Sequence, residues 1–199
     1  IEAVTGQQAH EVIRAGVFEP SGVGDTIFLP PAESPPQPVV RGYAAGTLRA
    51  ALDLLPSIQH LKEEASLAGD DYYDVMVAPQ DFLESVGWTG GGIEAQSFAV
   101  ATIFRAMFDG TLLTDESVES FTTKNAVEGD YALGLSVGET AGYVSYSHGG
   151  GVPGFRSHAA YYPELDIALA MSANAVPIDP DVGRLARRIV ELIAPPVEG

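Results

Sequence analysis

Nine residues in the C-terminal third of the chain, Ser147–Phe155 (SHGGGVPGF), contain four glycines and one histidine, His148. Glycine loses more conformational freedom on folding than any other residue, so a cluster of glycines marks either tight turning or a backbone that another molecule approaches closely. Two interpretations follow from the residues alone. The stretch is a loop that only reverses the chain, or it is a binding site at which His148 is the polar group facing a ligand.

The residues around this stretch predict an antiparallel sheet. Beyond residue 130, short runs rich in β-branched and aromatic residues alternate with turn residues, which is typical of strands joined by hairpins. The predicted strands are Tyr131–Val137, Tyr143–His148, Phe155–Tyr162 and Ile167–Ser172. We expect three or four adjacent strands over 131–174, with the amphipathic helix Val182–Ile193 packed on one face.

The N-terminal part of the chain predicts helices. The clearest helical spacing of apolar residues runs from Glu94 to Phe108, after the Gly90–Gly92 turn, and Thr114 is a plausible N-cap for a second helix. A shorter helical pattern, Gln7–Ala15, stops at Gly16.

Between these helices the sequence predicts connections. Clustered prolines over 30–38 favour an extended surface segment, and Arg49–Leu67 is helical in part, interrupted at Pro56. Asp70–Asp74 has the composition of a solvated loop. At the start of the chain, Gly6 is typical of the residue that ends a helix, so the chain is expected to begin inside a helix. No capping residue, methionine or signal-peptide pattern comes before it. This start is either chance or the mark of an upstream portion outside this sequence.

Composition excludes several classes of function. The chain has 199 residues, 46% of them hydrophobic, which is enough for one domain with a core. A formal net charge of −17 repels phosphate backbones and anionic lipids, so nucleic acid is excluded as an expected partner. The chain has no cysteine for disulfides or thiolate metal sites, no apolar run of membrane-spanning length, and four histidines without the spacing of a metal site.

One short motif points to a different hydrolase fold. Gly134–Gly138 matches the G-x-S-x-G elbow, in which a serine is exposed on a turn from a strand into a helix. Here Ser136 is followed by Glu139–Gly142 and another predicted strand, so the context of the elbow is missing. We expect Ser136 to lie in a hairpin strand.

The order of these features resembles the serine β-lactamase-like family, which includes class C β-lactamases, D-alanyl-D-alanine carboxypeptidases, D-aminopeptidases and related esterases. The stretches that carry the resemblance, in chain order, are Ile1–Gly6, Phe18–Thr26, Arg41–Tyr43, Gly90–Gly92, Asp109–Leu113, Tyr131–Leu135 and His148–Phe155. The resemblance covers nearly the whole chain and implies an α+β fold, an antiparallel sheet packed by helices. It implies that residues 1–199 are the C-terminal portion of one such domain, with a helical part over 1–128, strands over 131–174 and a terminal helix over 181–194.

The resemblance also assigns roles within the opening stretch. In this family, the strand beside the active-site serine carries K-T-G or H-T-G, and His148-Gly149-Gly150 stands at that position. The glycines would let a substrate carbonyl lie against the strand, and the Gly151 amide would face the developing oxyanion, where one such donor is worth roughly 2.7–4 kcal/mol. His148 would contact the substrate carboxylate or the acid/base network.

The sequence departs from the family pattern in three places. No serine has a lysine three residues later, since the lysines are Lys62 and Lys124, so the S-x-x-K nucleophile motif is absent. Ser172-Ala173-Asn174 matches the spelling of the second motif but follows the third, so we expect a structural role for it. Gly149 replaces the usual threonine. We therefore expect a separate N-terminal segment or chain carrying S-x-x-K, and no activity from this chain alone.

The function implied is that of a serine hydrolase fragment. The expected substrates are β-lactams, D-amino-acid peptides such as those of peptidoglycan, or esters, cleaved through an acyl-enzyme without metal or cofactor. The resemblance also implies a secreted or periplasmic location. The alternative is a non-catalytic binding protein that kept the scaffold and lost the serine.

Overall fold

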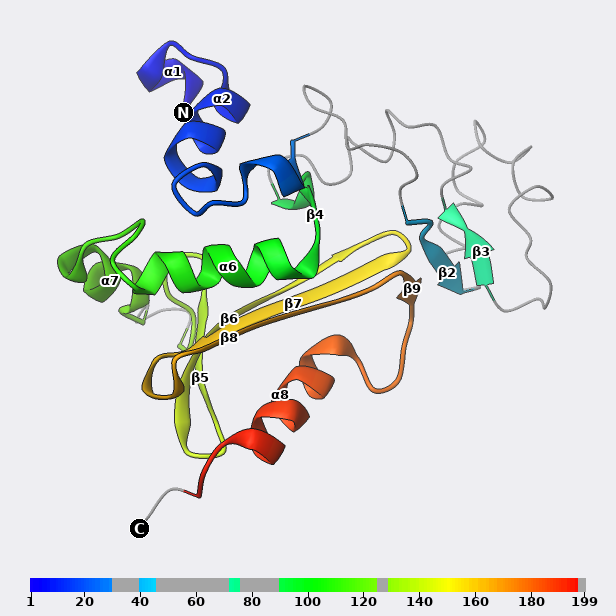
Figure 1. The fold of residues 1–199 in the computed structure, drawn as a ribbon. Helices are drawn as coiled ribbons and strands as arrows, with labels where there is room; N and C mark the ends of the chain where they lie inside the picture. Colours follow the sequence, from blue (N-terminus) through cyan, green and yellow to red (C-terminus); the bar gives the residue numbers. More distant parts are fainter. Residues whose placement is uncertain (30–39, 46–71, 76–89, 125–128, 197–199) are drawn as a thin grey trace.

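A four-stranded antiparallel sheet is the centre of the structure. The structure is a computed structural model, and it describes residues 1–29, 40–45, 72–75, 90–124 and 129–196. Its strands are β5 (Ser136–Thr140), β6 (Tyr143–Val152), β7 (Phe155–Tyr162) and β8 (Ile167–Ala173). They lie in the order β5-β6-β7-β8, each antiparallel to the next, as Figure 1 shows. The predicted meander is confirmed, and Ser136 begins a hairpin strand rather than a turn into a helix.

Two tight turns set the register of this sheet. Thr140 pairs with Tyr143 across Ala141 and Gly142, whose φ angles of 54° and 83° are both positive, as the favoured two-residue hairpin turn requires. Val152 pairs with Phe155 across Pro153 and Gly154. Because each connection has only two residues, the strands cannot slip without breaking the turn.

The bounds of two strands differ from the sequence prediction. Tyr131–Leu135 is not strand, and only Tyr131 forms an isolated bridge, to Ser136. β6 is longer than predicted, because β7 supplies a partner for each of its residues from Tyr146 to Val152. The glycines at 149–151 are therefore part of a strand, and the interpretation of this stretch as a loop is wrong.

Helices cover both faces of the sheet (Figure 1). Helix α6 (Ser97–Phe108) lies on one face, where the Phe108 ring stacks on Tyr146 and Tyr161 with 5.0 Å between centroids. Helix α6 also packs on β8, whose Ala168 and Ala170 share this face with Tyr161, because paired residues project to the same side. The other face packs against α8 (Val182–Ile193), where Ala160, Tyr162 and Val190 form a buried cluster.

Local sequence explains why α8 begins where predicted. The Asp181 carboxylate accepts hydrogen bonds from the backbone N–H groups of Gly183 and Arg184, at 2.9 and 3.1 Å, and so satisfies two donors that the first turn leaves free. Val182, Ala186 and Val190 recur every four residues and are buried. This helix matches the predicted bounds.

A second apolar cluster holds the N-terminal segment. It consists of Phe18, Val23, Ile27 and Ala99. Helix α1 (Glu2–Thr5) ends at Gly6, and α2 (Ala9–Ile13) continues into a π-helical turn, η1 (Arg14–Phe18). The prediction that the helix ends at Gly16 is wrong, because η1 continues to Phe18, whose side chain is buried in the cluster. The short 3-10 turn η2 (Gly24–Thr26) follows.

Helix α6 begins later than its apolar spacing predicts. Glu94 and Ala95 form β4, which pairs with β1 (Ile27–Phe28), so the helix starts at Ser97 rather than Glu94. Helix α7 (Asp115–Thr122) begins as expected, with the Thr114 hydroxyl accepting a hydrogen bond from the Ser117 N–H at 3.2 Å.

A small three-stranded sheet lies beside the β6–β7 hairpin. Its order is β3 (Tyr72–Asp74), β2 (Tyr43–Ala45) and β9 (Ala175–Val176). Residues 72–74 are therefore strand rather than the predicted loop, because β2 pairs with them. The predictions for 30–38 and 49–67 fall outside the described residues. No helix among the described residues is long and apolar enough to cross a membrane.

The β6–β7 turn provides a test of this packing. Gly154 has a φ of 78°, and a Cβ there would lie 2.9 Å from the Gly42 carbonyl carbon and 3.0 Å from the Tyr43 nitrogen. We expect Gly154→Ala to lower the free energy of unfolding by more than about 2 kcal/mol, because both the backbone angle and the space oppose a side chain.

Gly149→Ala is the matched control within the same hairpin. A Cβ at Gly149 meets its nearest atoms at 3.8 and 3.9 Å, an ordinary contact distance. This variant should be neutral or stabilised by about 0.5 kcal/mol through a less flexible unfolded chain. Urea unfolding of both variants measures the difference, and equal stability would show that the hairpin end is not packed as described.

Candidate active site

The candidate site lies where β6 runs past the end of β5. The last pair between the two strands joins Ser136 to Ser147, so the next five residues, His148–Val152, have no partner on that side among the described strands. On the other side the same five residues are fully paired with β7. The stretch is therefore a strand with one edge that is open among the described residues.

The register determines which backbone groups face this open edge. Residues that flank a two-residue hairpin turn exchange backbone hydrogen bonds with each other, so Tyr143 bonds toward β5 and Val152 toward β7. Directions alternate along an antiparallel strand. Both turns independently give the same result: the N–H and C=O groups of Gly149 and Gly151 point to the open edge.

Side chains alternate in the same way. Tyr146, His148 and Gly150 face the α6 side of the sheet, while Gly149 and Gly151 face the α8 side, opposite His158 and Arg156. His148 is exposed at the edge, and Gly150 adds no side chain beside it. The edge therefore presents an imidazole followed by bare backbone.

A tyrosine that was not predicted as a site residue forms a hydrogen bond with this histidine. The Tyr131 hydroxyl lies 2.9 Å from His148 Nε2, and the two rings meet edge to face with centroids 6.0 Å apart. Which atom donates depends on the imidazole tautomer. The only sequence signal was the position of Tyr131 in the Tyr131–Leu135 stretch, which the periodicity misassigned to a strand.

A row of serine hydroxyls continues from Gly150 across the α6 face. Ser157 pairs with Gly150 on one side and with Ser172 on the other. The Ser97 hydroxyl, on the first turn of α6, donates to the Ser172 hydroxyl at 3.0 Å. The surface beside the open edge is therefore polar along the sheet.

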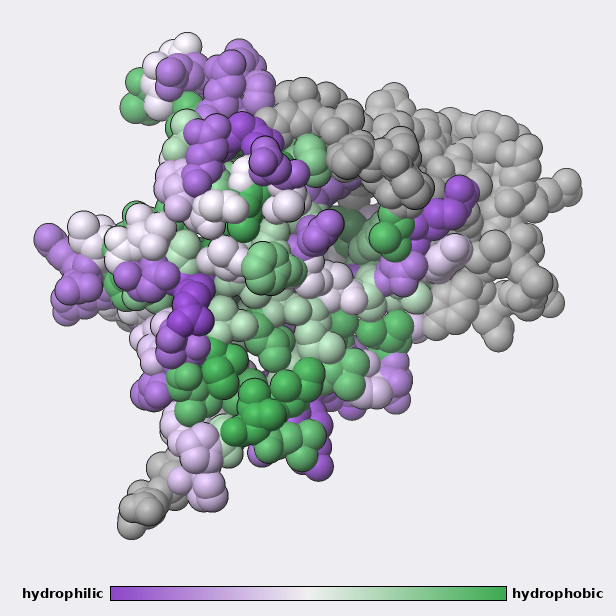
Figure 2. Space-filling model, in the orientation of Figure 1, coloured by the Kyte–Doolittle hydropathy of each residue, from purple (hydrophilic) through white to green (hydrophobic). Residues whose placement is uncertain are grey.

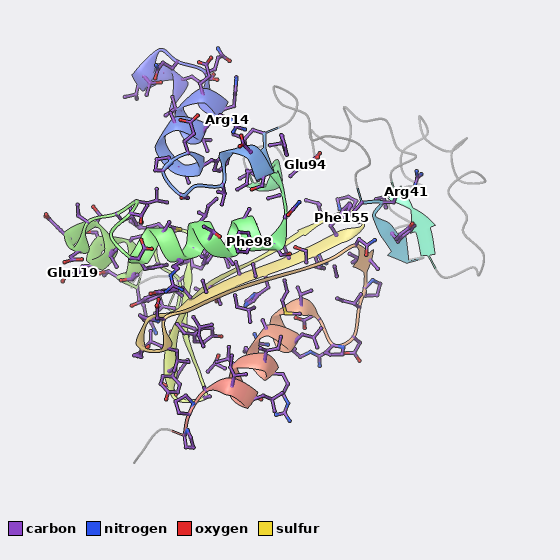
Figure 3. The ribbon with its side chains drawn as sticks, viewed as in Figure 1. Arg14, Arg41, Glu94, Phe98, Glu119 and Phe155 are labelled. Atoms are coloured by element: carbon purple, nitrogen blue, oxygen red, sulfur yellow. The ribbon has the colours of Figure 1, made fainter. Side chains whose placement is uncertain are left out.

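The far end of the edge is fixed by two segments distant in sequence. Tyr43 N–H bonds both to the Gly154 carbonyl, at 3.3 Å, and to the Asn174 carbonyl, at 2.8 Å. Figure 3 shows Phe155 at this end of the hairpin, close to Arg41. The Asn174 side chain donates to the Arg41 carbonyl at 2.8 Å, which agrees with the structural role expected for Ser172-Ala173-Asn174.

The glycines at 90–92 also reach this end of the edge; Gly90 and Gly91 are helical rather than the predicted turn. A Cβ added at Gly91 would lie 3.3 Å from a methyl carbon of Val152, the last residue of the open stretch. Two of the segments singled out in the sequence, around Gly91 and Gly42, therefore meet the hairpin in space.

Comparison with known proteins decides the family. The β-lactamase family model matches residues 1–194. The chain belongs to the β-lactamase family. No curated protein matches its sequence.

Solved structures confirm the β-lactamase-family fold. The D-stereospecific amidohydrolase from a Streptomyces species is 20% identical, with a TM-score of 0.65, covering 98% of this chain and 51% of that one. The D-amino acid amidase from Ochrobactrum anthropi SV3, complexed with L-phenylalanine, is 19% identical, with a TM-score of 0.69, covering 96% and 55%. The penicillin-binding protein from Bacillus halodurans is 20% identical, with a TM-score of 0.67, covering 94% and 51%. The chain thus spans about half the length of these family structures.

The described part of this β-lactamase-family chain offers no metal site. No group of three or more His, Cys, Asp or Glu side chains within it is placed to hold an ion. His148 and His158 lie on opposite faces of the sheet, and His60 is outside the described residues. The predicted residues His148, Gly149, Gly150 and Gly151 do share one edge.

A Cβ at Gly149 is not excluded by space. The direction of a Cβ at Gly149 leads toward His158 Nδ1, 3.9 Å away, and the Ser157 carbonyl, 3.8 Å away. A Cβ at Gly151, in contrast, would overlap the Arg156 guanidinium, which covers that glycine from the α8 side. That guanidinium is the end of an exposed, flexible side chain, so a Cβ at Gly151 requires only that Arg156 move aside.

His158 provides a test of the packing beneath this strand. Burial, and then the charge of Arg187, hold the pKa of its imidazole below the usual 6.5, although Asp181 opposes the shift. The unfolded chain takes up a proton at this histidine as the pH falls through 6.5, whereas the folded chain resists it, so stability falls with pH in that range.

We expect the urea midpoint of the wild-type chain to fall more between pH 7.5 and 5.5 than that of His158→Gln, which has no titrating group there. The comparison of the two slopes cancels the titration of other groups. Parallel slopes would show that His158 is as well solvated in the folded chain as in the unfolded one.

Proposed function

We propose that this chain supplies the substrate-binding edge of a serine hydrolase whose nucleophile lies on a segment carrying S-x-x-K. The observation that carries the proposal is the five-residue open edge of β6, with His148 on the α6 side and the Gly151 N–H in the plane of the sheet. Such an edge accepts an extended substrate by backbone hydrogen bonds, and the glycines leave the approach unobstructed.

The chemistry follows from what the edge can donate. The serine oxygen attacks the substrate carbonyl carbon while its proton passes to the lysine amine, and the carbonyl π electrons move onto oxygen. The Gly151 N–H would donate to that oxyanion. As the oxyanion collapses, the leaving amine or alcohol takes the proton, and water then attacks the acyl-enzyme and releases the acid and the serine.

The substrate class proposed is a β-lactam, a D-amino-acid peptide or amide, or an ester. The similar structures include a D-amino acid amidase and a penicillin-binding protein, which supports this class by analogy. His148, held by Tyr131, would contact the substrate carboxylate or the acid/base network from the α6 side.

A non-catalytic binding protein is the second candidate. Lys124 is the one lysine among the described residues, and its ammonium pairs with the Asp130 carboxylate at 2.7 Å rather than with a serine. If no S-x-x-K segment accompanies this chain, the open edge would bind a peptide or ester without cleaving it.

Covalent labelling by acylating probes distinguishes the isolated chain from the complete enzyme. We expect the isolated 199-residue chain to show no covalent labelling by a fluorophosphonate or a fluorescent penicillin, because a nucleophilic serine needs a base within hydrogen-bond reach. The same chain joined to the polypeptide encoded directly upstream of Ile1 should be labelled on the upstream part. Stoichiometric labelling of a serine within residues 1–199, detected by peptide mass spectrometry, would contradict the proposed division.

Substitutions in the joined protein test the roles at the edge. His148→Ala should lower turnover of an ester or D-amino-acid substrate by about 10²-fold, the scale of a positioned acid/base or charge contact. Tyr131→Phe keeps the ring and loses the hydroxyl, and should cost about tenfold, the equivalent of one hydrogen bond.

Tyr143→Phe is the matched control for the tyrosine variant. Its hydroxyl donates to the Pro195 carbonyl at 3.1 Å, at the other end of β6. Turnover should be unchanged in this variant.

If His148→Ala retains full activity but unfolds at a lower urea concentration, His148 is a structural residue and the proposed role is wrong.

A further inference from the structure

A cavity lies between helix α7 and the bend that leads into β5. The bend comprises residues 130–135, and Figure 1 shows α7 beyond the C-terminal end of α6. The volume of the cavity is about 340 Å³, which is within the range of sites for small ligands. It is lined by Leu113, Glu116, Ser117, Ser120, Phe121 and Leu133.

Backbone hydrogen bonds hold the walls of this cavity. The Leu133 N–H donates to the Phe121 carbonyl at 3.3 Å, which joins the bend to the last turn of α7. Within the bend, the Ala132 N–H donates to the Leu135 carbonyl at 2.7 Å, and the side chains of both residues are buried. The cavity is therefore formed without a ligand, so a ligand would not have to order it on binding.

Apolar side chains make up half of the lining. Leu113 and Phe121 are half-buried, and Leu133 is 63% exposed. Together they leave apolar surface in contact with water. An apolar group that covers this surface would be favoured by about 25 cal/mol for each Å² removed from water.

The polar part of the lining includes a carboxylate and a hydroxyl without partners. Glu116 and Ser120 are four residues apart on α7, so their side chains are neighbours on one face of the helix. Neither side chain forms a hydrogen bond or an ion pair with another residue in the described part of the chain. The Ser117 hydroxyl, in contrast, accepts a hydrogen bond from the Thr114 hydroxyl at 3.0 Å, within the helix cap.

Charge favours a cationic ligand at this cavity. The sequence of α7, DESVESFT, has three acidic residues and no basic one, and the whole chain carries a formal net charge of −17. Cations are attracted to such a surface and anions are repelled. In Figure 2, hydrophilic and hydrophobic side chains lie next to each other where Figure 1 places α7.

We propose that this cavity binds a small primary amine that has an apolar body and no carboxylate. The ammonium donates to the Glu116 carboxylate and the Ser120 hydroxyl, and the apolar body covers Leu113, Phe121 and Leu133. The proposal does not depend on the hydrolysis proposed above, because none of the residues that line the cavity lies on β6.

Three probes of similar size test the class of ligand. They are 2-phenylethylamine, 2-phenylethanol and 3-phenylpropionate, which carry an ammonium, a hydroxyl and a carboxylate on a phenyl-alkyl body. When added to protein labelled at its leucine methyl groups, the amine should shift the NMR signals of Leu113 and Leu133. It should bind about fivefold more tightly than the alcohol, the equivalent of one exposed ion pair, and the carboxylate should bind more weakly than the alcohol. The signal of Leu185, on α8, should not move.

Variants identify the groups that bind. Glu116→Gln should remove the preference for the amine over the alcohol, whereas Glu119→Gln, on the same helix but outside the cavity lining, should retain it. Leu133→Ala should weaken binding of the amine and the alcohol alike, by about fivefold, because it removes apolar contact. Circular dichroism checks that each variant still folds.

The titrations are made both on the 199-residue chain and on the chain joined to the polypeptide encoded directly upstream of Ile1. Three outcomes would overturn the proposal: equal affinity for the three probes, loss of the amine preference in Glu119→Gln as large as in Glu116→Gln, and no shift of Leu113 and Leu133 in the joined protein. The last would show that the cavity is filled by another part of the polypeptide. A joined protein that is acylated but does not bind the amine contradicts only this proposal, and one that binds the amine without becoming acylated contradicts only the catalytic one.

Discussion

The register between β6 and β7 is the constraint on which the rest of the site depends. Seven consecutive pairs, from Tyr146–Tyr161 to Val152–Phe155, hold the glycine-rich stretch straight, although glycine by itself favours no such conformation. A shift of one residue would move His148 to the α8 face and turn the amides of Gly149 and Gly151 toward β7. The turn at Pro153–Gly154, packed against Gly42 and Tyr43, prevents that shift.

The two edges of the sheet differ in composition. The β6 edge carries an exposed histidine followed by three exposed glycines, which leave its backbone uncovered. The β8 edge is apolar on both faces and continues onto uncovered side chains of α8. Polar groups that are removed from water need replacement hydrogen bonds, whereas apolar groups need only contact, so the two edges require different kinds of surface to cover them.

Much of the fold follows from the sequence because local signals and burial agree. Period-two patterns between turn residues predict β7 within its observed bounds, and the Asp181 cap with apolar residues every four positions predicts α8. The predictions fail where a partner far along the chain overrides the local pattern. Pairing with Ile27 and Phe28 draws Glu94 and Ala95 out of the helical pattern into β4, and pairing with β2 makes a strand of the tyrosines at 72–73.

The sequence by itself determined the antiparallel meander, the terminal helix and the family resemblance, because these depend on periodicity, turn residues and motifs that are local in the chain. It also brought His148 and the three glycines after it to attention. Only the tertiary structure decided that these glycines form a strand with an open edge, because that depends on where β5 ends and on β7 pairing beyond it. The contact between Tyr131 and His148 likewise joins residues 17 positions apart, through a bend that no periodicity describes.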